Sequence, residues 1–164
     1  MTDPTQIPAG LTIRTATTAD GDAVLNLVAE VLSEFGLFIE PTGIDSDLPD
    51  IEQSYLSPGG NFEVIEDADG KIVGSVGLFA ISSDVCELRK MYLTPALRGA
   101  GLGKYLLERT VEEAKRRGFR TMILETSTKL EAANHLYQKF GFTKIFHEHP
   151  SRRADLAYQL ALDS

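Results

Sequence analysis

The sequence is poor in cysteine, contains no tryptophan and has no long apolar run. Cys86 is the single cysteine among 164 residues, so no internal disulfide can form and a reducing compartment is expected. No window approaches the roughly 18 apolar residues that a membrane-spanning helix needs, and the N-terminus lacks the basic and apolar segments of an export signal. We therefore expect a cytoplasmic protein that makes no membrane contact.

Positive charge is also scarce. The chain has 16 Lys and Arg against 24 Asp and Glu, a net charge of −8. This balance disfavours sequence-independent binding to nucleic acid or anionic lipid, and makes an amine or a cationic peptide the easier partner. With 43% hydrophobic residues, the length suits one domain, which we expect over residues 10–164 after a flexible tail at 1–9.

Hydrophobic periodicity predicts alternating strands and helices. A stripe from Asp20 predicts a helix that ends at Gly36, and later helices end at Gly118 and Gly141. Thr128 and Glu131 have the spacing of a capping box for the last helix. Strands are expected at residues 11–14, 62–66, 71–80, 86–94, 120–125, 143–147 and 155–162, and an irregular connection at 36–60 with a short helix near 49–56. This order indicates a mixed α/β fold with helices on both faces of the sheet.

One segment carries a phosphate-binding pattern. A glycine-rich turn at residues 98–104 joins a strand to a helix, where backbone N–H groups converge at the positive end of the helix dipole. Two nucleotide-binding motifs fail on spacing. A dinucleotide fingerprint needs glycine where Lys104 or Leu106 stands, and a P-loop needs glycine at Arg98 and Ser or Thr at Tyr105.

The remaining pattern, R-x-x-G-x-G from Arg98 through Gly101 to Gly103, resembles the pyrophosphate loop of the GNAT superfamily of acyl-CoA N-acyltransferases. About 30 residues later, N-x-x-Y-x-x-x-G-F from Asn134 resembles the family's second conserved block. The resemblance covers residues 11–162 and implies the GNAT fold, with a central mixed sheet of about seven strands flanked by about four helices.

The resemblance also implies a binding mode for acetyl-CoA, with no metal. The strand before the loop should splay from its neighbour, and its free backbone groups should pair with the pantetheine arm, while a backbone N–H near Met91 stabilises the oxyanion. Asn134 would contact the cofactor arm. The implied cofactor-binding residues are Met91, Tyr92, Leu93, Arg98, Gly99, Ala100, Gly101, Leu102, Gly103, Lys104, Asn134 and Tyr137.

Catalytic roles follow from the same resemblance. Tyr137 matches the tyrosine that protonates the departing thiolate, although it also fits the core stripe of its helix. Glu87 has the spacing of the catalytic glutamate in some members. Strand alternation would put Glu87, Arg89 and Met91 on one face and Leu88, Lys90 and Tyr92 on the other. Arg89 is the candidate for binding a substrate carboxylate, or it forms a structural pair with Glu87.

Other features favour ordinary interpretations. His147 and His149 lack further ligands at a metal-binding spacing, so no metal site is expected. Cys86 is expected to be a core residue, and the acidic stretch at 45–52 a solvated loop.

Three functions remain open. The first is acetyl transfer to a small-molecule primary amine by direct attack. The second is acetylation of a protein or peptide, and the third is a non-catalytic acyl-CoA-binding module. The family resemblance also allows a homodimer.

Overall fold

The predicted strands and helices are found close to their expected positions. The computed structural model describes residues 7–146 and 154–162. The described strands are β1 (Thr12–Thr15), β2 (Asn61–Glu66), β3 (Ile72–Ala80), β4 (Val85–Leu93), β5 (Thr121–Thr126), β6 (Thr143–Ile145) and β7 (Leu156–Ala161). The described helices are α1 (Gly21–Ser33), α2 (Leu102–Arg116), α3 (Glu131–Phe140), the π-helix η3 (Glu52–Leu56) and two 3₁₀ turns, η2 (Thr18–Asp20) and η4 (Pro95–Leu97).

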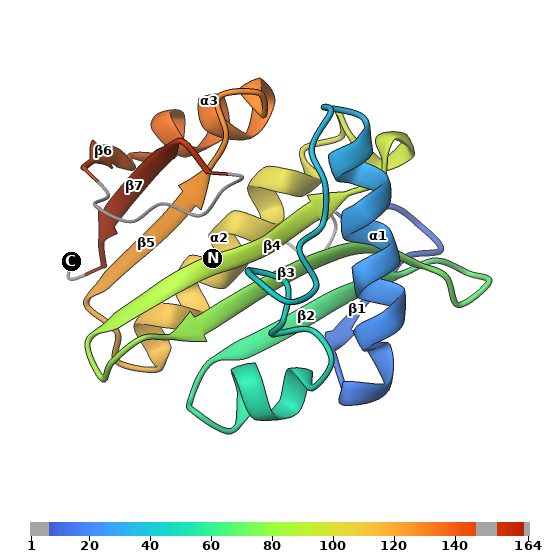
Figure 1. Cartoon of the computed structure of the whole chain (residues 1–164), viewed down its shortest axis with the longest axis horizontal. Helices are drawn as coiled ribbons and strands as arrows, with labels where there is room; N and C mark the ends of the chain where they lie inside the picture. The colour runs from blue at the N-terminus through green and yellow to red at the C-terminus, as the bar shows by residue number, and fades with distance from the viewer. Residues whose placement is uncertain (1–6, 147–153, 163–164) are drawn as a thin grey trace.

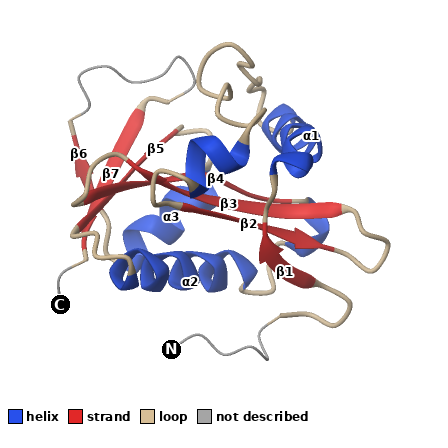
Figure 2. Ribbon diagram, turned by 90° about the horizontal axis from the view of Figure 1, so that it is seen from below, coloured by secondary structure: helices blue, strands red, loops and turns tan. Residues whose placement is uncertain are grey.

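The strands form one mixed sheet in the order β1-β2-β3-β4-β5-β7-β6 (Figure 1). Neighbouring strands are antiparallel except β4 and β5, which are parallel and joined by the crossover through α2. Two cores cover the two faces. Side chains of α1 and η3 pack on one face, and side chains of α2 and α3 on the other. Figure 2 shows the ribbons of α1 and α2 on opposite sides of the sheet. The predicted fold, a sheet of about seven strands with about four helices, is confirmed.

The predicted helix ends at glycine are also found. Gly118 follows α2 with φ +90° and Gly141 follows α3 with φ +119°, the left-handed conformation that glycine adopts without a Cβ clash. The predicted capping box at Thr128 is wrong. Both the N–H and the hydroxyl of Thr128 donate to the Asp155 carboxylate, at 2.8 and 2.9 Å, and α3 begins after Leu130. The N–H and hydroxyl groups of Thr128, which were expected to take part in the helix cap, therefore bind a carboxylate near β7 instead.

Candidate functional site

The site lies where two parallel strands separate. β4 and β5 pair only from Val85 to Glu87, opposite Thr121 to Ile123, although both strands continue beyond these residues. The predicted splaying of β4 is therefore confirmed. A cavity of about 560 Å³ extends along the gap, and this volume is in the usual range for a small-molecule site. Its lining includes Met91, Tyr92 and Leu93 from β4 and residues 124–127 from β5 and the following turn.

A bulge in β4 changes the faces on which its side chains lie. Ser75 of β3 pairs with Tyr92 while Gly77 pairs with Arg89, so Lys90 and Met91 together oppose one residue. Lys90 has φ +54°, and its carbonyl accepts a 2.6 Å hydrogen bond from the Ser75 hydroxyl.

The predicted alternation is consequently wrong beyond Arg89. Met91 packs with Leu88 in the core under α2, whereas Tyr92 packs in the core under α1. Lys90 lies on the side of Arg89, because both form ion pairs with Asp47.

The glycine-rich turn has the backbone conformation of an anion-binding loop. Gly99 and Gly101 have φ of +86° and +79°, and Gly101 is the N-cap of α2. The first N–H groups of a helix have no intrahelical partner and point out of its N-terminus. Arg98, Gly99 and Gly103 line the cavity. Ala100 and Gly101 are exposed, the Leu102 side chain is buried in the core, and Lys104 is exposed and 3.8 Å from Glu108.

Tyr137 projects from α3 into the cavity and is otherwise buried. Burial, together with the nearby Tyr92, raises the pKa of its phenol, so the proton is retained at neutral pH. Asn134, on the same helix face, is also buried, and its Nδ2 donates to the Ser127 carbonyl at 2.8 Å. The Asn134 Oδ1 has no hydrogen-bond partner among the described residues. Tyr137 and Ser127 line the cavity, whereas Asn134 is not among the lining residues.

Glu87 lies at the end of the paired part of β4, where it is buried and lines the cavity. Arg89 Nε donates to Glu87 Oε1 at 2.6 Å, and the Arg89 guanidinium stacks 3.7 Å from the centre of the Phe79 ring. Burial opposes the charge of Arg89, but its pKa is still raised because Glu87 and Asp47 are close. Arg89 is therefore occupied by protein groups in the structure.

Two acidic residues that the sequence placed in a solvated loop are buried instead. The exposed fraction is 1% for Asp45 and 8% for Asp47, and both form ion pairs with Lys90, at 3.1 and 3.3 Å. Asp47 also accepts a hydrogen bond from the Tyr55 hydroxyl, whose pKa is raised by burial and by this carboxylate. Sequence reasoning missed Asp45, Asp47 and Lys90. The available signal was the position of both acidic residues between apolar Ile44 and Leu48.

Within the described residues, nothing supports a nucleophilic cysteine or a metal site. The pKa of the Cys86 thiol is raised by burial to about 12, which keeps it protonated. No group of three or more potential metal ligands occurs within 7–146 and 154–162, and His147 and His149 lie outside these ranges.

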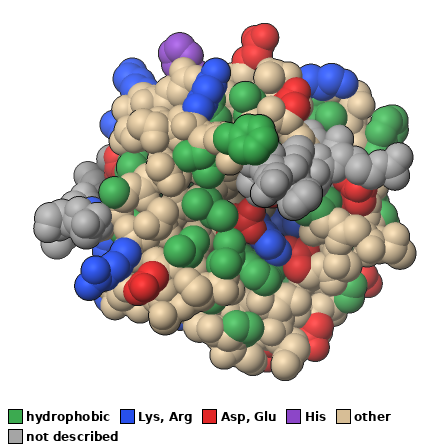
Figure 3. Space-filling view, turned by 60° about the vertical axis from the view of Figure 1, so that its left-hand side comes forward, with side chains coloured by type: hydrophobic (Ala, Val, Ile, Leu, Met, Phe, Trp, Pro, Cys, Tyr) green, Lys and Arg blue, Asp and Glu red, His purple; other side chains and the backbone are tan. Residues whose placement is uncertain are grey.

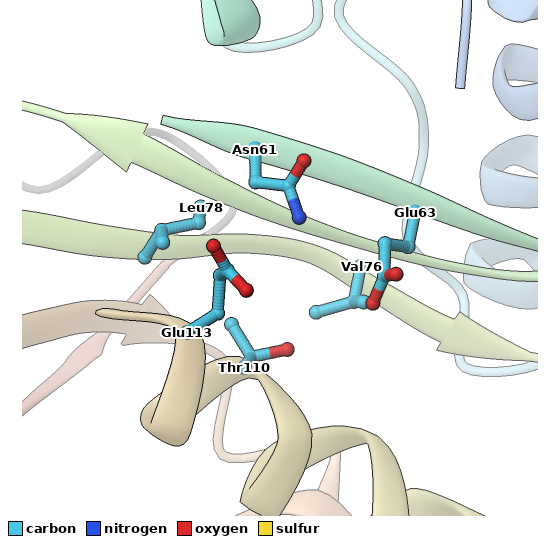
Figure 4. Close-up of a pocket in the computed structure, with 6 residues that line it drawn as sticks. All are labelled: Asn61, Glu63, Val76, Leu78, Thr110 and Glu113. Carbon is cyan, nitrogen blue, oxygen red and sulfur yellow. The ribbon is translucent and has the colours of Figure 1, made fainter. Parts of the chain in front are cut away.

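A second pocket, on the α2 side of the sheet, is too small for a substrate. Figure 4 shows its lining, in which Glu63 from β2 and Glu113 from α2 both take part. Its volume of about 10 Å³ gives room for roughly one water molecule. The 560 Å³ cavity is therefore the candidate active site.

In the space-filling view of Figure 3, hydrophobic side chains gather beside acidic and basic ones on one face of the molecule.

No helix in the described part of the chain is long and apolar enough to cross a membrane.

Comparisons with known proteins agree with this geometry. The sequence profile described as the Acetyltransferase (GNAT) family matches residues 28–142. The chain is 36% identical to the uncharacterized N-acetyltransferase YjgM of Escherichia coli, over 84% of this chain and 85% of that protein.

Solved structures agree with the fold. A GNAT-family acetyltransferase from Staphylococcus aureus superposes with a TM-score of 0.86 at 24% identity, covering 93% of this chain and 99% of that one. YncA from Salmonella typhimurium, solved with its cofactor acetyl-CoA, superposes with a TM-score of 0.68 at 23% identity, covering 94% and 95%. The predicted acetyltransferase class is confirmed: the chain belongs to the GNAT family of acetyltransferases.

Proposed function

We propose that the protein transfers an acetyl group from acetyl-CoA to the primary amine of a small molecule in the cytoplasm. The observation that carries this proposal is the cavity between β4 and β5, which has a glycine-rich helix N-terminus at one end and a buried carboxylate, Glu87, at the other. Acetyl-CoA needs an anion site for its phosphates and a passage for its arm, which the glycine-rich loop and the cavity between β4 and β5 would provide.

The residues present fit this co-substrate. Beyond Glu87 no residue of β4 pairs with β5, so an extended ligand arm would lie along this open edge of the strand. The amide N–H groups of residues 99–104 would bind the pyrophosphate. The unpartnered Oδ1 of Asn134 would accept a hydrogen bond from the arm or from a bridging water, since a buried acceptor without a partner is costly.

When bound, acetyl-CoA supplies an acetyl group activated as a thioester, which a neutral amine can attack. An alkyl ammonium has a pKa of about 10.4, so it must lose a proton first. Glu87 is the proposed base, directly or through a water, because it lines the cavity, and Arg89 binds one of its two carboxylate oxygens, Oε1. Arg89 would hold this carboxylate in place. Tyr137, which keeps its proton at neutral pH, would donate to the leaving sulfur.

A thiol-release assay tests the proposal. The protein would be mixed with acetyl-CoA and either small amines, including alkylamines, arylalkylamines, polyamines and amino acids, or peptides with a free N-terminus or lysine. We expect release of free CoA with a small amine. Release with peptides alone would favour a protein acetyltransferase. Binding of acetyl-CoA without release from any acceptor would indicate a non-catalytic module and contradict the proposal.

A further inference from the structure

Lys90 is a buried cation held by one segment of the irregular connection between α1 and β2. The exposed fraction of its side chain is 2%. Its Nζ lies 3.1 Å from the Ile44 carbonyl, 3.1 Å from Asp45 Oδ1 and 3.3 Å from Asp47 Oδ1. All three partners lie within residues 44–47, and Ile44 and Lys90 both line the active-site cavity. Lys90 thus attaches this segment to the bulge of β4.

Asp47 links this attachment to the proposed base. It is shared by Lys90 and Arg89, whose Nη1 is 3.7 Å away, and it accepts a hydrogen bond from Tyr55. Arg89 in turn binds Glu87 through Nε at 2.6 Å. A continuous path of charged groups therefore runs from Lys90 through Asp47 and Arg89 to Glu87.

We propose that Lys90 is a positioning residue for acetyl transfer, which sets the orientation of Glu87 through Asp47 and Arg89; this inference rests on the proposed function. Without Lys90, two buried carboxylates would lose their shared cation, and Asp47 would compete with Glu87 for the guanidinium of Arg89. Lys90 also holds a positive φ that is uncommon for a residue with a side chain, and its contacts with residues 44–47 and Ser75 maintain this conformation.

A double-mutant cycle separates this role from general damage. Lys90→Met, Glu87→Gln and the double variant would be assayed by thiol release with acetyl-CoA and the small amine that the panel identifies. We expect Lys90→Met to lower kcat/KM for the amine at least about tenfold while the Kd for acetyl-CoA changes less than about twofold. Because Lys90 acts through Glu87, the double variant should be no slower than Glu87→Gln alone. The control, Lys71→Met, removes an exposed lysine from the turn before β3 and should have no effect.

Independent losses that add in the double variant would overturn the proposal, as would full activity of Lys90→Met in an active wild-type background. Hydrogen exchange gives a second readout: residues 40–48 should exchange faster in Lys90→Met than in wild type, and unchanged exchange would contradict the attachment. If Lys90→Met does not fold, Asp45→Asn replaces it in the same cycle. It removes one carboxylate from Lys90 and is expected to show a smaller loss with the same non-additivity. An inactive wild type would instead refute the proposed function itself.

Discussion

Arg98 and Glu34 form a bidentate ion pair between the glycine-rich loop and the end of α1, with N–O distances of 2.8 and 3.0 Å. Arg98 also donates to the Leu93 carbonyl through Nε and Nη2, at 3.2 and 2.9 Å. Most of the guanidinium is therefore committed to protein groups, and its charge is balanced by a carboxylate. This pair ties the glycine-rich loop to the C-terminal end of α1.

Replacing Glu34 with Gln should strengthen acetyl-CoA binding. The substitution removes a negative charge beside the loop that is proposed to bind phosphates, so the Kd should fall by about two- to fivefold at low ionic strength, as expected for a partly exposed pair. The gain should shrink at high salt, because screening weakens such interactions. Titration calorimetry at two salt concentrations measures both effects. Glu30→Gln, an exposed residue on the same helix, is the control, and an equal gain there would show that only net charge matters.

Removing the Tyr137 hydroxyl should slow the chemical step and leave binding intact. Tyr137→Phe preserves the ring contacts with Phe142 and Tyr158 but removes the proposed proton donor, so kcat should fall by about 100-fold while the Kd for acetyl-CoA stays within about threefold. Tyr158→Phe deletes a hydroxyl that accepts from Gln138, in the adjacent ring, and serves as the matched control. Similar kcat losses in both variants would point to packing instead of acid catalysis.

The effect of Glu87→Gln should depend on pH. At pH 7 an amine acceptor is almost fully protonated and needs a base, so kcat/KM should fall by about 100-fold. Near pH 9 a larger fraction of the amine is already neutral, and the deficit relative to wild type should narrow by about tenfold. Glu125→Gln, a carboxylate from β5 that lines the same cavity, should show a smaller and less pH-dependent loss. A deficit independent of pH would argue against a base role for Glu87.

Two glycines of the glycine-rich loop should respond differently to alanine. Gly101 has φ +79° with nothing within 4 Å of an added Cβ, so Gly101→Ala meets backbone strain of about 1 kcal/mol but no steric clash. Gly103 lies in α2 without a positive φ, and its Cβ would lie 3.6 Å from Leu136 Cδ2, an ordinary contact.

Thermal melting and acetyl-CoA titration separate these effects. Gly101→Ala should lower Tm, whereas Gly103→Ala should leave Tm unchanged or slightly raised, because alanine is the better helix former. Both should weaken acetyl-CoA binding, Gly101→Ala by altering the N–H groups at the start of α2 and Gly103→Ala by adding a methyl group to the cavity wall. Unchanged affinity in both variants would contradict the assignment of this loop to the phosphates.

The features that could be predicted from the sequence are those that depend on residues close together in the chain. Periodic apolar positions and helix-ending glycines are local signals, so the strands, the helices and the glycine-rich turn were found near their predicted bounds. Glu87 and Tyr137 were placed by motif spacing, and both line the cavity.

The rest depends on contacts between distant residues. The bulge at Lys90 arises in the pairing of β4 with β3, where the Ser75 hydroxyl donates to the Lys90 carbonyl. Strand alternation assumes regular pairing, so it could not predict this bulge. Asp45 and Asp47 are buried because a cation more than 40 residues away neutralises them. Thr128 likewise binds Asp155 instead of capping α3.

The ladder between β4 and β5 is short, and it divides the sheet into two parts. Within the sheet, three residue pairs join the part β1–β4 to the part β5–β7–β6. A ligand whose own amides hydrogen-bond to the open edges of β4 and β5 would act as a missing strand and bind both parts of the sheet at once. Occupancy of the site would then join the two parts of the sheet, and a ligand at concentration [L] would raise the free energy of unfolding by RT ln(1 + [L]/Kd).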